Sequence, residues 1–428
     1  MLHDDLVGRT LAGLTRSPWR PLALAIVALL VAILGGVTAH RLAVQTPGAP
    51  TRLAIRVSCD PASCALAESL ALDVWSEERG PGLPLDVVVT DRQLPLLAAA
   101  HVRWEVLVPD IDAAAREERD RLRAPTAARP GDWFGEYRDF TAIADHLREL
   151  AALAPDRVSL QAIGASVDGR PLWALRIRGR GANPTPMLIN GTQHAREWLA
   201  TMATTCVADR LVRDYDRDPA IRAFVDRTDL WIVPVVNPDG YQYTWSSDRY
   251  WRKNRRGSEG VDLNRNFAVA WGGPGSSPNE RAETYRGAYP FSEPESSALR
   301  DLVMREHIAL HLDFHTYSQL VLYPWTHTAT AAPDRARLAA IGDRIASAIF
   351  AAHQVRYALM PGAELYPAAG TMSDWVYGEA HAQSFTIELR PKGSPVRGRG
   401  GFVQPPRQIR PTCDEALAAT LALGQAAR

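Results

Sequence analysis

Residues 187–198 read MLINGTQHAREW, and this stretch decides how the rest of the chain is interpreted. The apolar run at 187–189 predicts a buried strand, and the Asn-Gly pair after it is a turn signal. His194 and Glu197 follow, three residues apart. An imidazole and a carboxylate at this spacing can bind one zinc ion, and a catalytic zinc needs a third protein ligand and one open position. The stretch therefore predicts a strand that ends at a metal site.

A candidate third ligand lies in residues 308–315, which read IALHLDFH. Apolar residues recur there at every second position, which is typical of a strand, and His315 is at its end. Open α/β sheets bind their ligands beyond the carboxyl ends of the strands. We therefore expect His194, Glu197 and His315 to form a set of two histidines and one glutamate.

Other histidines of this region allow a different interpretation. His307 and His311 continue the spacing of four residues that ends at His315, as ligands on one face of a helix would. The alternation of apolar residues argues against a helix there. We therefore expect His307 and His311 to be structural.

Two further segments supply groups that a zinc hydrolase needs, namely a general base and a cation near the developing negative charge. Residues 384–390 read SFTIELR and predict a strand that places Glu388 near its end. Residues 251–256 read WRKNRR and predict a basic loop that contains Arg252. The sequence NRN at 264–266 predicts another loop with polar side chains.

These segments together resemble the zinc carboxypeptidases of the carboxypeptidase A type. The resemblance covers residues 132–428, about 70% of the chain, and several motifs in one order are far more specific than any single motif. The matching motifs are His194-x-x-Glu197, Trp251-Arg252-Lys253, Val261 to Asn266, His315 to Leu320, Asp374-Trp375 and Phe385 to Arg390.

The resemblance implies a catalytic role for five of these residues. One zinc ion per chain would be bound by His194, Glu197 and His315. Glu388 would be the general base that takes a proton from a zinc-activated water, and Arg252 would stabilise the oxyanion.

The resemblance also implies how the substrate is bound. Asn264 and Arg265 would hold the terminal carboxylate of the peptide, a task that suits the planar guanidinium group. Tyr366 is at the position of a mobile tyrosine over the substrate, and Arg196 is at that of a further arginine that contacts the substrate. Every catalytic position is filled, which argues against an inactive relative.

The same register places the floor of the pocket for the departing side chain at Ser373. Glu364 is the nearby acid, but it lies outside the floor register. A neutral pocket would leave a buried lysine or arginine unpaired, which is costly. We therefore expect a preference for neutral C-terminal residues, apolar or aromatic. The neighbouring wall positions are uncharged: Leu322, Ala368, Thr371 and Thr386.

The overall charge excludes some classes of function. Lysine plus arginine and aspartate plus glutamate number 48 each, so the net charge is zero. Nothing in the composition favours a nucleic-acid partner. The basic residues within 249–256 are instead expected to form part of an anion-binding wall beside the metal.

The N-terminus predicts export from the cytoplasm. Residues 22–39 form an uncharged, mostly apolar run, and Arg9, Arg16 and Arg20 precede it. The run approaches the roughly 20 residues that span a bilayer, and the arginines favour a cytoplasmic location for residues 1–21. The run exceeds a usual signal core, which favours a retained transmembrane anchor. Because residues 37–39 resemble a signal-peptidase site, cleavage and secretion, or release to a periplasm, remain the alternative.

The four cysteines agree with an oxidising compartment. Cys59 and Cys64 lie in a turn that could close a small disulfide loop, and their spacing does not indicate a zinc site. Cys206 and Cys413 are far apart in the sequence, and their pairing depends on distances that the sequence does not give.

A small α+β domain is expected at 51–123, after a linker at 40–50. It is similar in pattern and position to the ferredoxin-like prosegment of many secreted zinc carboxypeptidases. We expect it to lie against the active site and to reduce activity until a linker at 124–131 is cut, near Arg123 or Arg129. Its predicted strands are 53–57, 72–75, 85–89 and 102–108, with helices or turns at 63–70 and 91–100 and a helix at 111–123.

The catalytic domain is expected at 132–428, with an α/β fold in which helices cover both faces of a mixed, twisted sheet. The resemblance implies a sheet of mostly eight strands. The predicted strands are 158–163, 172–178, 186–190, 229–236, 308–315, 320–324 and 383–389. The predicted helices are 139–154, 197–215, 293–306, 334–353 and 414–426.

The sequence thus predicts a zinc-dependent metallocarboxypeptidase that hydrolyses the C-terminal bond of peptides or proteins, and a monomer. A cell-wall peptide hydrolase with the same fold is an alternative. A membrane-tethered binding module without catalysis is a second alternative from another class, against which the complete set of ligands, base and arginines argues.

Overall fold

An eight-stranded mixed sheet organises the larger part of the chain. The computed structural model describes residues 48–76, 83–123, 132–392 and 401–426. The chain divides into a unit at Met1–Pro50 and a unit at Thr51–Arg428, and the second holds every element named below. The expected membrane or signal segment at 22–39 lies outside the described residues. Among the helices that are described, none has the length and apolarity needed to cross a membrane.

Four parallel strands form the centre of the sheet, in the order β12, β9, β7 and β8. They read as apolar, β-branched or aromatic runs because helices cover both of their faces. Since these strands run in the same direction, their carboxyl ends meet at one edge of the sheet. Their bounds are Thr185–Gly191 for β7, Thr228–Val233 for β8, Leu310–Thr316 for β9 and Gln383–Leu389 for β12.

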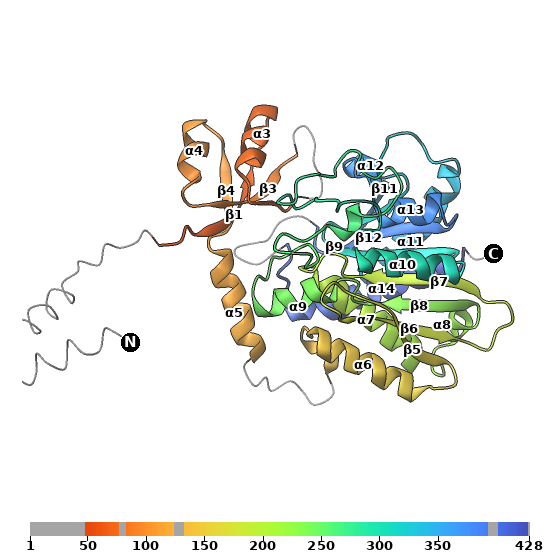
Figure 1. Ribbon diagram of the computed structural model, residues 1–428. Coiled ribbons are helices and arrows are strands. Elements are labelled where there is room, and N and C mark those ends of the chain that lie inside the picture. Colours follow the sequence, from red (N-terminus) through yellow and green to blue (C-terminus); the bar gives the residue numbers. More distant parts are fainter. Residues whose placement is uncertain (1–47, 77–82, 124–131, 393–400, 427–428) are drawn as a thin grey trace, which may run out of the picture. The chain divides into compact units, whose positions relative to one another are not determined.

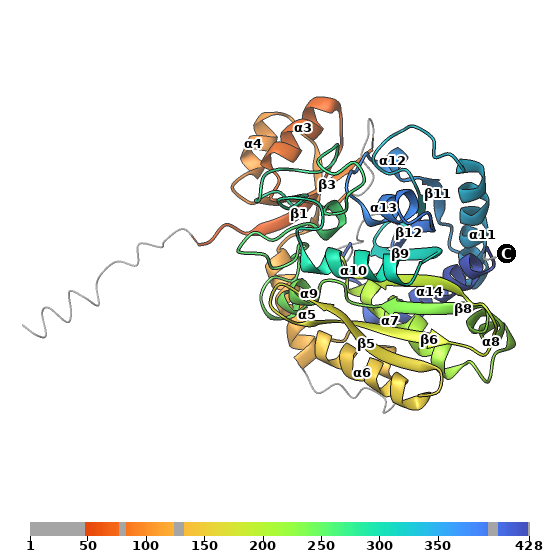
Figure 2. The same ribbon diagram turned by 45° about the vertical axis from the view of Figure 1, so that its right-hand side comes forward.

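Shorter or antiparallel strands complete the sheet on both sides, so that its order is β11-β10-β12-β9-β7-β8-β6-β5 (Figures 1 and 2). The predicted mixed sheet is confirmed, and the predicted strands fall within a few residues of the observed ones. The four-residue strand β11 was missed because it is short and ends in proline. The outer strands are β5 at Val158–Ala165, β6 at Pro171–Arg178, β10 at Leu320–Tyr323 and β11 at Ala358–Pro361.

The alternation of side chains along the strands divides the core into two layers. Met187 and Ile189 of β7 pack with α6, α7, α11 and α14, whereas Leu188 packs with α10 and α13 on the other face. The five predicted helices are present, and α8, α9, α12 and α13 were missed because each spans at most nine residues. The bounds are Phe140–Leu153 (α6), Trp198–Arg213 (α7), Pro219–Val225 (α8), Pro238–Ser246 (α9), Pro294–Arg305 (α10), Arg335–His353 (α11), Gly362–Leu365 (α12), Met372–Gly378 (α13) and Ile409–Gly424 (α14), with short 3₁₀ turns at Trp133–Gly135, Leu263–Arg265 and Pro406–Gln408.

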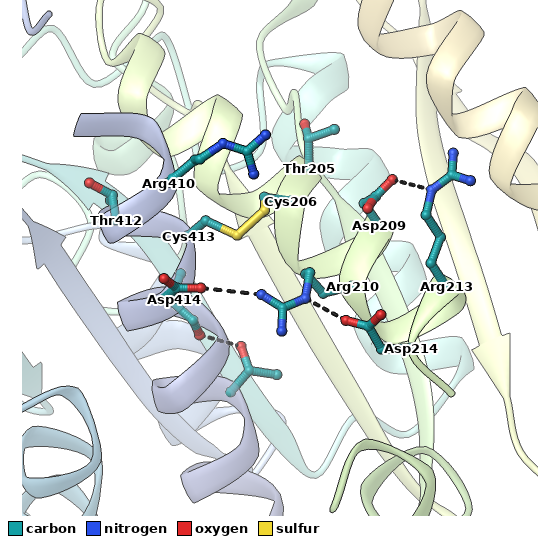
Figure 3. The surroundings of a disulfide bond; sticks show 12 residues. Thr205, Cys206, Asp209, Arg210, Arg213, Asp214, Arg410, Thr412, Cys413 and Asp414 are labelled. Carbon is teal, nitrogen blue, oxygen red and sulfur yellow. Dashed lines mark hydrogen bonds and ion pairs between the residues drawn. A yellow bond between two sulfur atoms is a disulfide. The ribbon is translucent and has the colours of Figure 1, made fainter. Parts of the chain in front are cut away.

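Helix α7 is the central helix of its layer and is joined covalently to α14. A disulfide links Cys206 of α7 to Cys413 of α14 (Figure 3). Beside it, Arg210 lies between Asp214 and Asp414. Because the bond closes a loop of 207 residues, loss of chain entropy in the unfolded state stabilises the fold by up to about 5 kcal/mol. The helix that follows the metal motif is therefore firmly anchored.

A separate four-stranded antiparallel sheet, in the order β2-β3-β1-β4, is formed by residues 52–108. Apolar side chains on one face of this sheet pack against α3 and α4 and form a core of their own. Asp60 caps α3 through the backbone amides of residues 62 and 63, and a disulfide joins Cys59 to Cys64. The elements are β1 at Arg52–Val57, α3 at Pro61–Leu70, β2 at Asp73–Val74, β3 at Leu85–Thr90, α4 at Leu94–Ala99, β4 at Trp104–Val108 and α5 at Ile111–Arg123.

Candidate metal centre and active site

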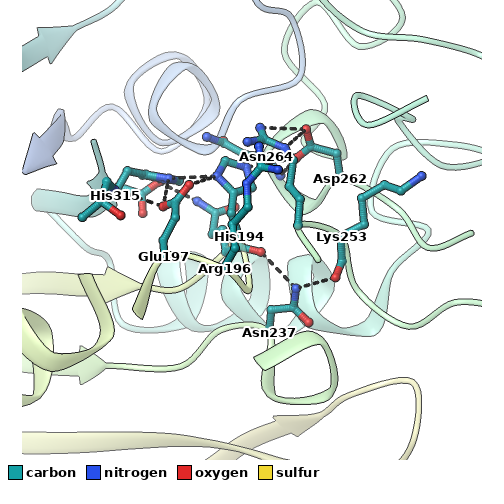
Figure 4. A network of polar contacts seen from close by, with 12 residues as sticks. His194, Arg196, Glu197, Asn237, Lys253, Asp262, Asn264 and His315 are labelled. Atoms are coloured by element: carbon teal, nitrogen blue, oxygen red, sulfur yellow. Dashed lines mark hydrogen bonds and ion pairs between the residues drawn. The ribbon is translucent and has the colours of Figure 1, made fainter. Parts of the chain in front are cut away.

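Three side chains meet at the carboxyl edge of the central strands. His194 lies in the loop after β7, Glu197 immediately precedes α7, and His315 is the next-to-last residue of β9. The adjacent β7 and β9 are parallel, with Asn190 paired to Asp313, so both chains leave the sheet at the same edge. The sequence predicted these three residues as a set, and the structure brings them together (Figure 4).

The atoms that face one another are two imidazole nitrogens and a carboxylate. His194 Nδ1 lies 2.8 Å from Glu197 Oε1. His315 Nδ1 lies 3.1 Å from His194 Nδ1 and 3.1 Å from Glu197 Oε2. All three residues are buried, with at most 4% of each exposed. Among the described residues, this is the group of histidine, cysteine and acidic side chains whose ligand atoms are close enough to share a metal ion.

The outer nitrogen of each histidine faces a buried carboxylate. His194 Nε2 lies 3.2 Å from Asp262 Oδ1, and His315 Nε2 lies 3.1 Å from Asp313 Oδ2. Such carboxylates hold the proton of a neutral imidazole on the outer nitrogen, which leaves the lone pair of the inner nitrogen available for a metal. The sequence alone did not indicate a role for Asp262 or Asp313. The available signals were that Asp313 lies two residues before His315 and that Asp262 belongs to the motif of Asn264 and Arg265.

The electrostatics of the group fit a cation. Burial opposes ionisation of Glu197, but the charges of His194 and His315 outweigh it and hold the pKa of Glu197 below its ordinary value. Burial likewise opposes protonation of His315, but Asp313 and Glu197 raise its pKa well above the ordinary value. The carboxylates thus favour positive charge at the point where the ligand atoms converge. Two nitrogens and a carboxylate are a donor set that suits zinc.

Glu388 lies beside this group on the neighbouring strand. In the parallel pairing of β9 and β12, Glu388 is directly opposite His315. Residues paired in this way point to the same face, and adjacent strands are about 4.8 Å apart. The predicted base is therefore next to a predicted ligand, and it is 7% exposed.

Arg252 reaches the same region from a loop. Its backbone carbonyl accepts a hydrogen bond of 2.9 Å from the amide of Ala195, which holds the loop against the metal motif. Its Nε and Nη2 donate to Asp262 Oδ2 at 3.2 and 3.0 Å. Asn237 also connects the loop to the segment that carries His194, because its Nδ2 donates to the carbonyl oxygens of Gln193 and Lys253 (Figure 4). Asp262 therefore positions His194 and Arg252 together.

The other basic residues of the loop do not form one wall with Arg252, contrary to our expectation. Arg249 donates to Glu118, and Lys253 donates to two backbone carbonyls. Arg255 lies over the rings of Tyr243 and Trp251, and Arg256 donates to Glu293. Each of these basic residues therefore has its own local partner, so residues that are close together in the sequence do not form one continuous positive surface.

Asn264, Arg265 and Tyr366 lie together in the structure. Arg265 Nη2 donates to the Tyr366 hydroxyl at 3.1 Å, and Asn264 Oδ1 accepts from the amide of Met372 at 2.9 Å. Gly370 makes the approach possible, because it has a φ of +74° and a Cβ there would lie 2.4 Å from the carbonyl oxygen of Arg265. The predicted carboxylate clamp is thereby joined to the loop that carries the predicted tyrosine.

Two acids near Ser373 in the sequence, Asp374 and Glu364, both have partners in the structure. Ser373 is buried in α13. The adjacent Asp374 accepts hydrogen bonds from the amides of Thr326 and His327 and from the imidazole of His327, so its carboxylate is occupied by the fold. Glu364 is exposed and pairs with Arg335 at 3.6 Å.

The four-stranded domain contacts residues beside the metal ligands. Arg196, between His194 and Glu197, donates from Nη1 to Asp73 of β2. The Trp75 ring stacks on Tyr250 with centroids 5.1 Å apart, and the Trp75 carbonyl accepts from the Tyr317 hydroxyl at 3.3 Å. Arg196 is therefore occupied by a carboxylate of the chain itself.

The remaining histidine of β9 has a structural role, as expected. His311 Nδ1 lies 2.8 Å from Ser384 Oγ, and its Nε2 lies 2.8 Å from Asn190 Oδ1. Burial lowers the pKa of His311 to about 4, so the ring is neutral near pH 7. It joins β9 to β12 and β7 just below the metal group.

The mixed sheet with a buried His-Glu-His group at its carboxyl edge defines a metal-dependent hydrolase of the α/β class. Residues 143–419 match the zinc carboxypeptidase family, and the chain belongs to that family. It is 34% identical to carboxypeptidase A1 of Mus musculus over 370 residues. This alignment covers 83% of this chain and 87% of the relative. Carboxypeptidase B of Bos taurus is 35% identical over 327 residues, with coverage of 74% and 76%. The solved structure of carboxypeptidase A from Helicoverpa armigera superimposes with a TM-score of 0.79 at 29% identity and covers 88% of this chain and 98% of its own.

The predicted activity and cofactor agree with these findings. The chain is a zinc-dependent metallocarboxypeptidase, a peptide hydrolase that acts at the carboxyl terminus. The buried His-Glu-His group fits the zinc on which this family depends.

Replacement of one ligand provides a test of the metal centre. We expect His315→Ala to abolish stoichiometric zinc binding, because two remaining ligands do not hold a catalytic zinc. His311→Gln is the matched control, since it alters a buried histidine four residues away on the same strand. Elemental analysis of the purified folded proteins measures the effect. Retention of one zinc by His315→Ala, or equal zinc loss in both variants, would contradict the assignment.

Proposed function

We propose that the chain removes single residues from the carboxyl termini of peptides with the side chains gathered around His194, Glu197 and His315. The observation that carries this proposal is the position of Glu388, which lies opposite His315 in the register of β9 and β12. A base next to a metal site is what peptide hydrolysis requires. Bound zinc supplies Lewis acidity and lowers the pKa of the attacking water.

Glu388 is proposed to accept the proton of the attacking water and to pass it to the departing amine. Arg252 is proposed to donate hydrogen bonds to the peptide oxygen as that oxygen becomes negative. The bond to Asp262 holds the Arg252 guanidinium in place before substrate binds, so little reorganisation accompanies the reaction.

Asn264 and Arg265 are proposed to bind the terminal carboxylate of the peptide. This contact would explain why only the last peptide bond is cut, because it fixes the distance from the carboxylate to the metal. Tyr366 is proposed to release Arg265 and to cover the bound residue. The 3.1 Å hydrogen bond between them supports this exchange, since an arriving carboxylate would replace the phenol as the acceptor.

The side chain of the departing residue is proposed to enter a neutral pocket with Ser373 at its floor. Two observations support neutrality. The carboxylate of Asp374 is occupied by backbone amides and His327, and Glu364 is exposed and paired with Arg335. A lysine or arginine would therefore be buried without a partner.

The domain at 51–123 is proposed to be a prosegment that keeps the enzyme latent until the chain is cut within 124–131, the segment that follows the last described turn of α5. Arg196 is proposed to contact substrate. In the intact chain, Arg196 donates a hydrogen bond to Asp73 instead of to substrate. Trp75 Nε1 donates to the same Asp73 oxygen at 2.8 Å and so holds the carboxylate toward Arg196. The Helicoverpa armigera match also extends over 88% of the chain, which is more than the segment 132–428 alone provides.

This latency is proposed to depend on pH through Glu283. Burial and the nearby Asp73 raise the pKa of Glu283 from 4.5 to about 7, against the opposing influence of Arg196, Lys253 and Arg252. Docking of the prosegment is thus accompanied by proton uptake. The contribution of Asp73 is lost on undocking, so the docked state is favoured at acidic pH and weakens as pH rises through about 7, where Glu283 ionises beside Asp73.

We further propose that the enzyme works outside the cytoplasm. The disulfides at Cys59–Cys64 and Cys206–Cys413 support this location, because such bonds persist in oxidising compartments. The apolar run at 22–39 would deliver the chain across a membrane, either as a retained anchor or as a cleaved signal.

The proposed base is tested by Glu388→Gln. The amide cannot accept the proton, so we expect kcat to fall by about 10²–10⁴-fold while one zinc stays bound. Glu364→Gln is the matched control and should leave kcat unchanged, because Glu364 is exposed and paired with Arg335. Steady-state hydrolysis by the enzyme cut in the linker provides the measurement. Near-full activity of Glu388→Gln would show that the base lies elsewhere.

The proposed pocket is tested with matched peptides that end in Phe, Leu, Ala, Lys or Arg. We expect kcat/KM to be higher for the neutral residues, and Ser373→Asp to shift the preference towards Lys and Arg by about tenfold or more, because a buried cation then gains a partner. Glu364→Gln serves as the control and should preserve the order. A preference of the unaltered enzyme for Lys or Arg that Glu364→Gln removes would place Glu364 in the pocket instead.

The proposed prosegment is tested by comparing the intact chain with the chain cut in the linker. We expect the cut to raise activity, and Asp73→Asn to raise the activity of the intact chain about tenfold, since it breaks a buried charged contact. Asp112→Asn is the matched control, because Asp112 pairs with Arg52 inside the same domain. Equal turnover of the intact and cut chains would reduce the domain to a folding aid.

The ratio of cut to intact activity should be larger at about pH 5.5 than at about pH 7.5, and Glu283→Gln should flatten that difference.

A further inference from the structure

A cavity lined by arginines lies away from the metal centre. Its volume is about 760 Å³. Its charged lining residues are Arg227, from the turn before β8, and Arg337 and Arg344 of α11. The other lining residues are Ala340, Ile341, Gln425 and Ala426, so no acidic side chain of the described residues lines the cavity.

The three guanidinium groups lack partners among the described residues. No hydrogen bond, ion pair or ring contact joins the side chains of Arg227, Arg337 or Arg344 to another described side chain or backbone group. Arg335, on the same helix, differs in that it pairs with Glu364. The acid next to Arg227, Asp226, is already occupied by the Tyr215 hydroxyl and the amide of residue 180. All three residues are exposed, and three cations of like sign around one cavity create a positive local potential that attracts anions.

The fold places this cavity at the opposite edge of the sheet from the zinc ligands. Arg227 immediately precedes Thr228, the first residue of β8, and Thr228 pairs with Thr185 at the start of the parallel strand β7. His194 follows the other end of β7. The length of these strands, about 20 Å, therefore separates the two sites along the sheet.

We infer that this cavity is a second binding site, for an oligoanion that carries several phosphate or sulfate groups. Arg337 and Arg344 are seven residues apart on α11, which places them on one face about 10 Å apart. Arg227 approaches from a different element, so the three cations surround the cavity. A guanidinium fork binds phosphate or sulfate oxygens in pairs, and the small side chains of Ala340 and Ala426 leave room between the forks.

Calorimetric titration of the full chain tests this inference with two probes at constant ionic strength. Inorganic tripolyphosphate represents a phosphate source, and sucrose octasulfate represents a sulfated saccharide. We expect at least one to bind, and Arg337→Gln and Arg344→Gln each to weaken that binding about tenfold. The probe that binds more tightly identifies the source of the anionic groups.

Arg335→Gln is the matched control, because it removes the same charge from the same helix outside the cavity. It should leave the affinity within about twofold of the unaltered chain. The melting temperatures without probe show whether each variant is folded. The inference is overturned if neither probe binds, or if the two cavity variants bind the probes as Arg335→Gln does, since the anions would then occupy another surface.

Discussion

The convergence of His194, Glu197 and His315, all almost fully buried, is the constraint on which the rest of the structure depends. Two imidazole nitrogens face each other at 3.1 Å, a distance at which lone pairs repel unless a proton or a cation lies between them. The central parallel strands bring the residues to one edge, and Asp262 and Asp313 orient the two rings. The disulfide between α7 and α14 stabilises the helix that begins immediately after Glu197.

The groups beside the predicted metal site are linked to one another and to the domain at 51–123. Asp262 contacts both His194 and Arg252, so the orientation of the His194 ring and the position of the Arg252 guanidinium depend on each other. Arg196 lies between two ligands in the sequence, and its guanidinium is within reach of Asp73. A carboxylate of the domain at 51–123 thus occupies an arginine that is proposed to contact substrate, and this contact involves none of the three residues His194, Glu197 and His315.

Much of the catalytic fold could be predicted because the decisive residues are local in the sequence. Period-two alternation identified β9, and short spacing linked His194 to Glu197. The four-residue strand β11 and the short helix α13 carry too few residues for a periodic signal. The partners of the basic loop could not be predicted either, because Glu118 and Glu293 are far from it in the sequence and only folding brings them close. The same holds for the pairing of Cys206 with Cys413.

X-ray absorption at the zinc edge, combined with calorimetric titration of the metal-free full chain, tests the central claim most directly. We expect one zinc to bind per chain, with two imidazole ligands, oxygen ligands and no sulfur. A different number of imidazoles, a sulfur ligand, or failure to bind one zinc tightly would contradict the assignment of His194, Glu197 and His315 as the metal centre.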